Sequence, residues 1–140
     1  MEPYVLPVVL KLTIAAFLGL VIGLERNFAH KEPGMRTFSL ITMGSALFVI
    51  LGNSIVNQTG VDQTRIISQI ATGIGFLGAG VIIFHEKKLQ GLTTAATIWI
   101  AAAIGATVGF GAYLVAGFAA ALTVFILSVL WKLEDWLDIK

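Results

Sequence analysis

Three long stretches of this sequence contain no charged side chain, and they constrain the fold more than any other feature. Residues 37–61, 66–85 and 89–131 hold no Asp, Glu, Lys or Arg over 25, 20 and 43 residues. One transmembrane helix needs roughly 20 mostly apolar residues, whereas a water-soluble domain has about 25% charged residues. Only 12% of this chain is charged. The sequence therefore predicts an all-α membrane protein and excludes a soluble fold.

These stretches, with the apolar segment before them, divide into five expected transmembrane helices. The longest run is too long for one helix, and Gly109 with Gly111 marks a turn inside it. Lys11 lies in the first span, close enough to its start for the ammonium to reach the interface. We expect a compact bundle forming a single transmembrane domain over residues 1–140, without a soluble domain. The expected spans are 3–24, 37–56, 66–84, 93–108 and 112–131.

The basic residues gather in alternate connecting segments, which predicts an orientation. Basic residues are more frequent on the cytoplasmic side of membrane proteins, so we expect the N-terminus outside and the C-terminus inside. The outer loops then hold only Arg65. The inner segments hold Arg26, Lys31, Arg36, Lys87, Lys88, Lys132 and Lys140. The expected partner is the lipid bilayer, and a net charge of +1 gives no reason to expect nucleic acid.

Small residues recur at four-residue spacing inside the spans. Gly19 with Gly23 and Gly105 with Gly109 form G-x-x-x-G pairs, a spacing that lets helix backbones approach closely in lipid. Ala71, Gly75 and Ala79 repeat the spacing, as do Ala116 and Ala120. We interpret these faces first as packing within the chain. Contact between copies, giving a homo-oligomer, is the alternative.

The third span is the richest in glycine, with Gly73, Gly75, Gly78 and Gly80. The first three satisfy G-x-G-x-x-G, but a nucleotide site also needs a preceding strand and an acidic residue about 20 positions later. The sequence has neither, so we reject that interpretation. Two remain open: a central helix that admits close neighbours on all sides, which we favour, or an interrupted helix whose exposed backbone binds ions.

Four short motifs together resemble the MgtC/SapB family of bacterial membrane proteins. They are Gly23-Leu-Glu25-Arg26, residues 33–37 (Pro-Gly-Met-Arg-Thr), residues 73–80, and residues 91–96 with Trp99. The resemblance covers about residues 10–113 and implies a bacterial inner-membrane protein linked to magnesium homeostasis and, in pathogens, to virulence. Some members add a soluble C-terminal domain, and this chain looks like a short form that lacks it.

Polar residues that the expected topology brings to the cytoplasmic side form the first candidate site. Glu25 is the only carboxylate near the apolar boundary there, and a part-buried carboxylate needs a cationic partner. We expect it to pair with Arg26 or Arg36 and fix the loop; binding of an anionic group or a docking partner is the alternative. Threonine hydroxyls commonly cap helix N-termini, so we expect that role first for the two that begin the fourth span. Capping accounts for only one of them, and packing or a place in the cluster is the alternative for the other. The cluster is Glu25, Arg26, Arg36, Thr37, Thr93 and Thr94.

A second polar cluster marks the entry to the third span on the outer side. It consists of Asp62, Arg65 and Gln69. Arg65 and Gln69 are four residues apart and share a helix face. We interpret this cluster as an interface anchor, with an outer polar vestibule as the alternative.

The sequence offers no set of residues for catalysis. It has no Cys, no Walker motif and no Ser-His-Asp set, so we expect no enzyme and no cofactor. Magnesium prefers oxygen ligands, usually including one or two carboxylates, and the spans lack Asp and Glu away from their ends, so ligand spacing does not support a magnesium site. Our first hypothesis is a non-enzymatic modulator that acts through helix contacts with a membrane partner. The alternative is an oligomeric magnesium or cation channel or carrier.

Overall fold

Five long helices make up the structure, as the spacing of charges predicts. The computed structural model describes residues 5–59, 62, 64–85 and 88–137, and within them all side chains except those of 55–59, 84, 85 and 88. The helices are α1 (Val5–Phe28), α2 (Met35–Thr59), α3 (Thr64–Val81), α4 (Leu92–Gly109) and α5 (Tyr113–Phe125). A π-helical turn, η1 (Ile126–Leu130), and a short helix, α6 (Trp131–Trp136), continue α5 as one rod.

Four of these helices are long and apolar enough to cross a membrane. They cover Val5–Phe28, Met35–Ser54, Leu92–Gly109 and Tyr113–Trp136. The all-α membrane fold is therefore confirmed. Helix α3 is present where a fifth span is expected but is not among the four, since its first half carries Arg65, Ser68 and Gln69. That α3 crosses the bilayer stays a prediction.

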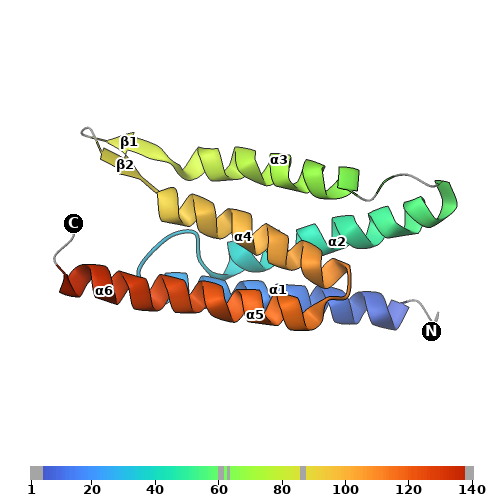
Figure 1. Ribbon diagram of the computed structural model, residues 1–140, viewed down its shortest axis with the longest axis horizontal. Coiled ribbons are helices and arrows are strands. Elements are labelled where there is room, and N and C mark those ends of the chain that lie inside the picture. Colours follow the sequence, from blue (N-terminus) through green and yellow to red (C-terminus); the bar gives the residue numbers. More distant parts are fainter. Residues whose placement is uncertain (1–4, 60–61, 63, 86–87, 138–140) are drawn as a thin grey trace.

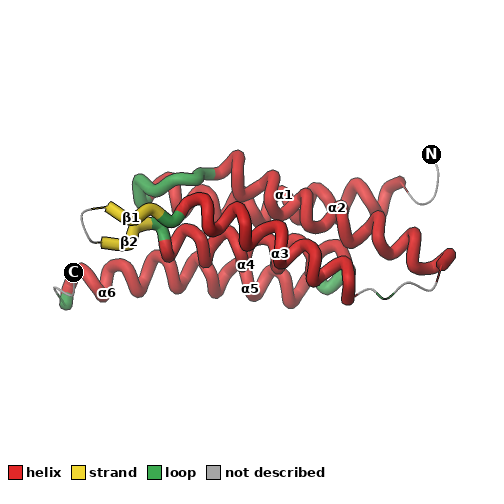
Figure 2. The backbone as a smooth tube through the Cα atoms, turned by 90° about the horizontal axis from the view of Figure 1, so that it is seen from above, coloured by secondary structure: helices red, strands yellow, loops and turns green. Residues whose placement is uncertain are grey.

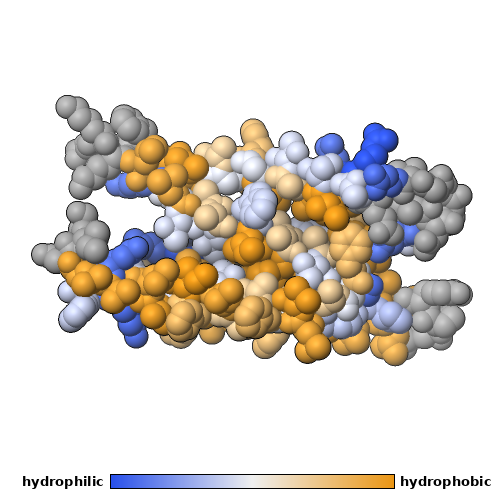
Figure 3. All heavy atoms as spheres, in the orientation of Figure 1, coloured by the Kyte–Doolittle hydropathy of each residue, from blue (hydrophilic) through white to orange (hydrophobic). Residues whose placement is uncertain are grey.

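Helix α4 is the centre of the bundle. It packs against α1, α2, α3 and α5, and 56% of its residues are buried, against 17–33% of the other three candidate spans. Figure 1 shows α4 between α3 and α5, with α1 and α2 behind them. Hydrophilic residues gather toward the two ends of the face drawn in Figure 3. The core comes mainly from small and branched side chains of four helices, among them Ala15, Ile22, Phe38, Ala46, Ile98, Ala101, Ile104, Val108, Ala116 and Ala120.

The connections lie at the two ends of the bundle in the arrangement that the sequence predicts. The α1–α2 connection, the α3–α4 connection and the end of α6 share one end, which we call the hairpin end (Figures 1 and 2). The start of α1, the α2–α3 connection and the α4–α5 turn share the opposite end. Which end faces the cytoplasm stays a prediction.

A two-stranded hairpin, which the sequence analysis missed, joins α3 to α4. Strands β1 (Ile83–His85) and β2 (Lys88–Gln90) are antiparallel, with Ile83 opposite Gln90. We expected the third span to run to residue 84, because the sequence stays apolar through Phe84. The helix instead ends at Val81. Gly91 follows β2 in the left-handed region, with φ of 86°, and a side chain there would overlap the carbonyl of Val81.

The α4–α5 turn is closed by glycine and by a lysine from α1. Gly111 adopts a left-handed φ of 87°, and its N–H and that of Ala112 donate to the carbonyls of Val108 and Thr107 at 2.9 and 3.1 Å, a Schellman motif. The Lys11 ammonium donates to the carbonyl of Gly109 at 2.8 Å. Lys11 therefore binds the C-terminal end of α4, where helix dipoles favour a cation, at the same end of the bundle as the start of α1.

Helices α1, α2 and α4 approach most closely around one residue of α2. A Cβ on Gly19 of α1 would overlap the Thr42 hydroxyl and the Phe38 carbonyl, and a Cβ on Gly105 of α4 would overlap the Thr42 backbone. Thr42 is fully buried, and its hydroxyl donates within α2 to the carbonyls of Phe38 and Ser39 at 3.1 and 3.0 Å. Both neighbouring helices thus need glycine at this level.

Replacing Gly105 by Ala tests this close approach. The added methyl group would meet the α2 backbone, so Gly105→Ala is expected to lower the free energy of unfolding in detergent by about 1–3 kcal/mol. Gly44→Ala is the matched control, because its Cβ would meet nothing within 4 Å and Ala favours helix by about 1 kcal/mol over Gly. Equal stability of the two variants would contradict the packing described here.

Candidate functional site

The residues of the predicted cytoplasmic cluster do lie at one end of the bundle, but they do not form one site. Glu25 and Arg26 are near the end of α1, Arg36 and Thr37 in the first turn of α2, and Thr93 with Thr94 in the first turn of α4, all at the hairpin end. Arg26 and Thr94 are buried and Glu25 is partly buried, whereas Arg36, Thr37 and Thr93 are exposed. The cluster thus divides into a buried pair, a loop contact and three exposed side chains.

Glu25 and Arg26 form a two-point ion pair. The guanidinium donates from Nε to Glu25 Oε2 at 2.6 Å and from Nη2 to Oε1 at 2.9 Å. The side chain of Arg26 is only 6% exposed and that of Glu25 only 11%. Such paired bonds fix both groups in one geometry. Of the two arginines that the sequence offered to Glu25, the structure pairs it with Arg26.

The first residues of the α1–α2 loop bond to carbonyls in the last turn of α1, and one loop carbonyl contacts α4. The N–H groups of His30 and Lys31 donate to the carbonyls of Asn27 and Arg26 at 3.1 and 2.9 Å, and His30 has a left-handed φ of 54°. These are the bonds of a Schellman motif. The Thr94 hydroxyl makes a long, 3.5 Å bond to the carbonyl of Glu32.

The capping role expected of Thr93 and Thr94 is wrong. Helix α4 begins at Leu92, Gly91 is its N-cap, and no side chain bonds there. The threonines therefore lie inside the first turn. Thr94 instead contacts the α1–α2 loop, and the Thr93 carbonyl accepts the Thr97 hydroxyl at 2.7 Å. Sequence alone favoured threonine as the cap because the hairpin that requires glycine at residue 91 was not expected.

Arg36 lies beside a small cavity at the hairpin end. This cavity has a volume of about 480 Å³ and is lined by residues of the α1–α2 loop and the first turn of α2, Arg36 and Thr37 among them. Arg36 is exposed and forms no ion pair within the part of the chain that the structure describes. Binding of an anionic group therefore remains a proposal for Arg36 and is not proposed for the buried pair.

The glycine-rich segment is an uninterrupted α-helix, so the alternative of an interrupted helix is wrong. The expectation of neighbours on all sides also fails. A Cβ on Gly78 would contact Ala95 of α4 at 3.7 Å, but Cβ atoms on Gly73, Gly75 and Gly80 would meet nothing within 4 Å. Helix α3 packs mainly on α4 and little on α2. Three of its four glycines are therefore uncovered.

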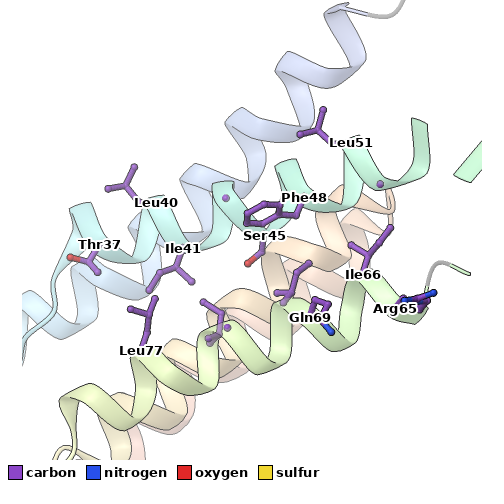
Figure 4. Close-up of a pocket in the computed structure, with 15 residues that line it drawn as sticks. Thr37, Leu40, Ile41, Ser45, Phe48, Leu51, Arg65, Ile66, Gln69 and Leu77 are labelled. Carbon is purple, nitrogen blue, oxygen red and sulfur yellow. The ribbon is translucent and has the colours of Figure 1, made fainter. Parts of the chain in front are cut away.

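An apolar groove, which the sequence analysis missed, separates α2 from α3. Its volume is about 880 Å³. Figure 4 shows side chains of both helices along it, with Ile41 and Leu77 close together toward one end and Arg65 at the other. Two glycines, Gly44 and Gly73, leave its walls open. The lining residues are Thr37, Leu40, Ile41, Gly44, Ser45, Phe48, Leu51, Gly52, Arg65, Ile66, Gln69, Ile70, Gly73, Ile74 and Leu77.

The predicted outer cluster divides between the start of α3 and this groove. Asp62 accepts the Thr64 N–H on Oδ1 at 2.9 Å and the Thr64 hydroxyl on Oδ2 at 2.8 Å. These bonds, the backbone one first, hold the pKa of Asp62 below its usual 3.8, and the charge of Arg65 adds to the effect. Arg65 and Gln69 line the groove. Asp62 thus lies just before α3 and bonds to its first residue, while Arg65 and Gln69 line the groove.

The described residues contain no group of three or more His, Cys, Asp or Glu side chains placed to hold a metal ion. The threonines that could have lined an ion path bond to their own helices: Thr72 to the Ser68 carbonyl at 2.8 Å and Thr97 to that of Thr93 at 2.7 Å. Asn53 Oδ1 is buried without a hydrogen-bond partner.

Removing Arg26 is expected to destabilise the protein strongly. Arg26→Ala would leave the Glu25 carboxylate without its cation, and breaking a buried pair costs about 3–5 kcal/mol. Arg36→Ala is the control, because Arg36 is exposed and surface substitutions usually change stability by less than about 0.5 kcal/mol. Thermal unfolding in detergent measures both. A larger loss of stability in Arg36→Ala than in Arg26→Ala would contradict the Glu25–Arg26 pairing.

Acid is expected to loosen the start of α3. Because the pKa of Asp62 is lowered in the folded state, its stabilising effect is complete above the usual value and disappears as the pH falls through the lower, folded pKa. The Thr64 amide chemical shift and its hydrogen exchange should report a midpoint below pH 3.8. Asp62→Asn keeps an acceptor but cannot titrate, so it should abolish the transition.

Comparison with known proteins identifies the family. The profile of the MgtC family matches residues 12–136. The chain is 40% identical to the putative magnesium transporter YhiD of Escherichia coli K12, over 89% of this chain and 61% of that protein. It is 43% identical to Protein MgtC of Brucella abortus, over 82% of this chain and 46% of that protein. It is 37% identical to SrpB of Synechococcus elongatus, over 90% of this chain and 80% of that protein.

No solved structure matches this chain. The chain spans about half to two thirds of the length of the first two relatives, so their whole activities do not transfer to it directly. The family profile nevertheless covers α1 from residue 12 onward and all of the other helices. The protein belongs to the MgtC family.

Proposed function

We propose that this magnesium-related membrane protein is a non-enzymatic modulator that binds another membrane protein through α3. Its setting is the bacterial inner membrane, in magnesium homeostasis or in adaptation to stress and virulence. The relative named a putative magnesium transporter supports the magnesium link, and family membership supports the membrane setting.

One observation carries the proposal: a stripe of small side chains on α3 has no neighbour in the bundle. Ser68, Thr72, Gly75 and Ala79 are exposed and follow one another at spacings of four, three and four residues, which places them on one helix face. We call this face the small stripe. The hydroxyls of Ser68 and Thr72 donate to carbonyls of α3 itself, at 2.8 Å each. A partner helix would therefore meet a shallow surface without having to satisfy these donors.

The composition of α3 favours protein over lipid as the neighbour of the small stripe. In lipid, helices associate through close packing of small residues and through polar contacts. Helix α3 is the one long helix among the described residues that is not apolar enough to count as a candidate span. It also lies at the edge of the bundle, packed mainly on α4. A second helix on the small stripe would remove its polar side chains from lipid.

A leucine on the small stripe is expected to block the partner without harming the fold. A Cβ on Gly75 meets nothing within 4 Å in this chain, but in a helix interface the larger side chain would cost about 1–3 kcal/mol. Gly75→Leu should weaken partner binding by roughly 5- to 150-fold. Gly117→Leu on α5 is the matched control, because its Cβ also meets nothing within 4 Å.

Cysteine cross-linking measures the binding of a partner to the small stripe, since the chain has no Cys of its own. Gly75→Cys should form an adduct with a membrane protein in cells grown at low magnesium, and Gly117→Cys should not. The Gly75→Leu variant should also lose support of growth at low magnesium. Reproducible magnesium flux into liposomes that contain only this protein would overturn the modulator proposal in favour of a channel or carrier. Adducts only between copies of this chain would make it a homo-oligomer contact.

A further inference from the structure

We propose that the α2–α3 groove binds one membrane phospholipid, with an acyl chain along the groove and the headgroup phosphate on Arg65. The groove is a different face of α3 from the small stripe: it is bounded by Ile66, Ile70, Gly73 and Leu77. The inference therefore does not rest on the proposed function, and either can fail without the other.

The size of the groove favours a lipid chain over a helix. Its volume is about 880 Å³, and its α3 wall from Arg65 to Leu77 rises about 18 Å at 1.5 Å per residue. A helix is 10–12 Å across with its side chains, so a segment of that length would fill roughly 1,400–2,000 Å³. A whole helix of this length would therefore not fit within the volume of the groove. Its length is more than half of the roughly 30 Å hydrocarbon layer, which suits a chain extending from one leaflet.

The walls of the groove are what an acyl chain requires. Between its ends the lining is almost entirely apolar, with large side chains such as Phe48, Ile66 and Ile70. Gly44 on α2 and Gly73 on α3 face open space, so the groove exists because both walls lack a side chain there. Ser45 is the polar residue in this stretch, and it is 4% exposed.

The charge at one end matches a phosphate. Arg65 is exposed in the first turn of α3 and lies at the end of the groove (Figure 4). An uncharged run of 20 residues follows it; with α3 across the bilayer, as the sequence predicts, Arg65 lies at the level of the headgroups. Within the described part of the chain it has no ion pair. The nearby carboxylate of Asp62 accepts hydrogen bonds from Thr64 and none from Arg65, although the charges of Asp62 and Arg65 interact.

Arginine and phosphate form strong, often two-point hydrogen bonds. The Gln69 amide lies on the same helix face, one turn along, and also lines the groove, so it can donate a further bond to the headgroup. Arg65 is the one basic residue in the lining of the groove; at the other end, Arg36 lines the neighbouring cavity, which shares Thr37 and Leu40 with the groove. The headgroup is therefore expected at the Arg65 end.

Native mass spectrometry of the purified protein tests this site. The protein is stripped of lipid and offered phosphatidylglycerol or a diacylglycerol with the same chains, which lacks the phosphate. One phosphatidylglycerol per protomer should be retained, and the diacylglycerol at least about tenfold less, a difference of about 1.4 kcal/mol. Arg65→Gln, which removes the charge, and Gly73→Leu, which fills the groove, should each lower phosphatidylglycerol retention by at least about tenfold.

Two controls separate this site from general effects. Gly117→Leu adds the same side chain at an equally open glycine outside the groove, and Lys132→Gln removes an exposed charge from α6; both should retain lipid as the unchanged protein does. Equal retention of the two lipids, or unchanged retention in Arg65→Gln and Gly73→Leu, would overturn the proposal. A Gly73→Cys disulfide between protomers would also overturn it, because a second copy would then occupy the groove.

Discussion

The close approach of three backbones at Thr42 is the contact on which the rest of this bundle depends. A membrane helix gains no hydrophobic energy by leaving lipid for another apolar helix, so association relies on close packing. Glycines of α1 and α4 meet α2 at the same level, and the Thr42 hydroxyl is bonded within its own helix, so the contact leaves no donor unsatisfied. Helix α5 then packs on α1 and α4, and α3 packs on α4. The peripheral helices are thus placed by a three-helix centre.

Charge placement in the sequence was enough to predict the helices, since uncharged length decides which segments can enter lipid. It also predicted which connections share an end of the bundle. Contacts across helices were harder to predict. Thr93 and Thr94 were expected to cap α4, but the unexpected hairpin places Gly91 there. Glu25 had two candidate partners, and only the conformation at the end of α1 selects Arg26. Which faces of a helix meet neighbours depends on all the other helices, and spacing within one segment does not contain that information.

Helix α3 shows this most clearly. Its glycines suggested a crowded central position, yet three of them meet nothing, because α4 holds the centre and covers only one side of α3. The two remaining faces differ in chemistry. One carries small side chains with internally bonded hydroxyls, and the other carries large apolar side chains with a cation at its end. Glycine therefore has two effects on α3: it flattens the surface of the small stripe, and it opens the groove between α2 and α3.

The bond from Lys11 to the Gly109 carbonyl has a consequence for the order in which the protein is assembled. The two residues are 98 positions apart, so the lysine is synthesised long before its acceptor. Lys11 lies in the first third of α1, so the cost of about 2.5–3.5 kcal/mol for a lysine at the centre of a membrane helix is an upper limit for it. Until α4 is complete, α1 carries this charge without its native partner. The arrival of the fourth helix therefore gives the ammonium its native acceptor and joins the end of α4 to the first helix.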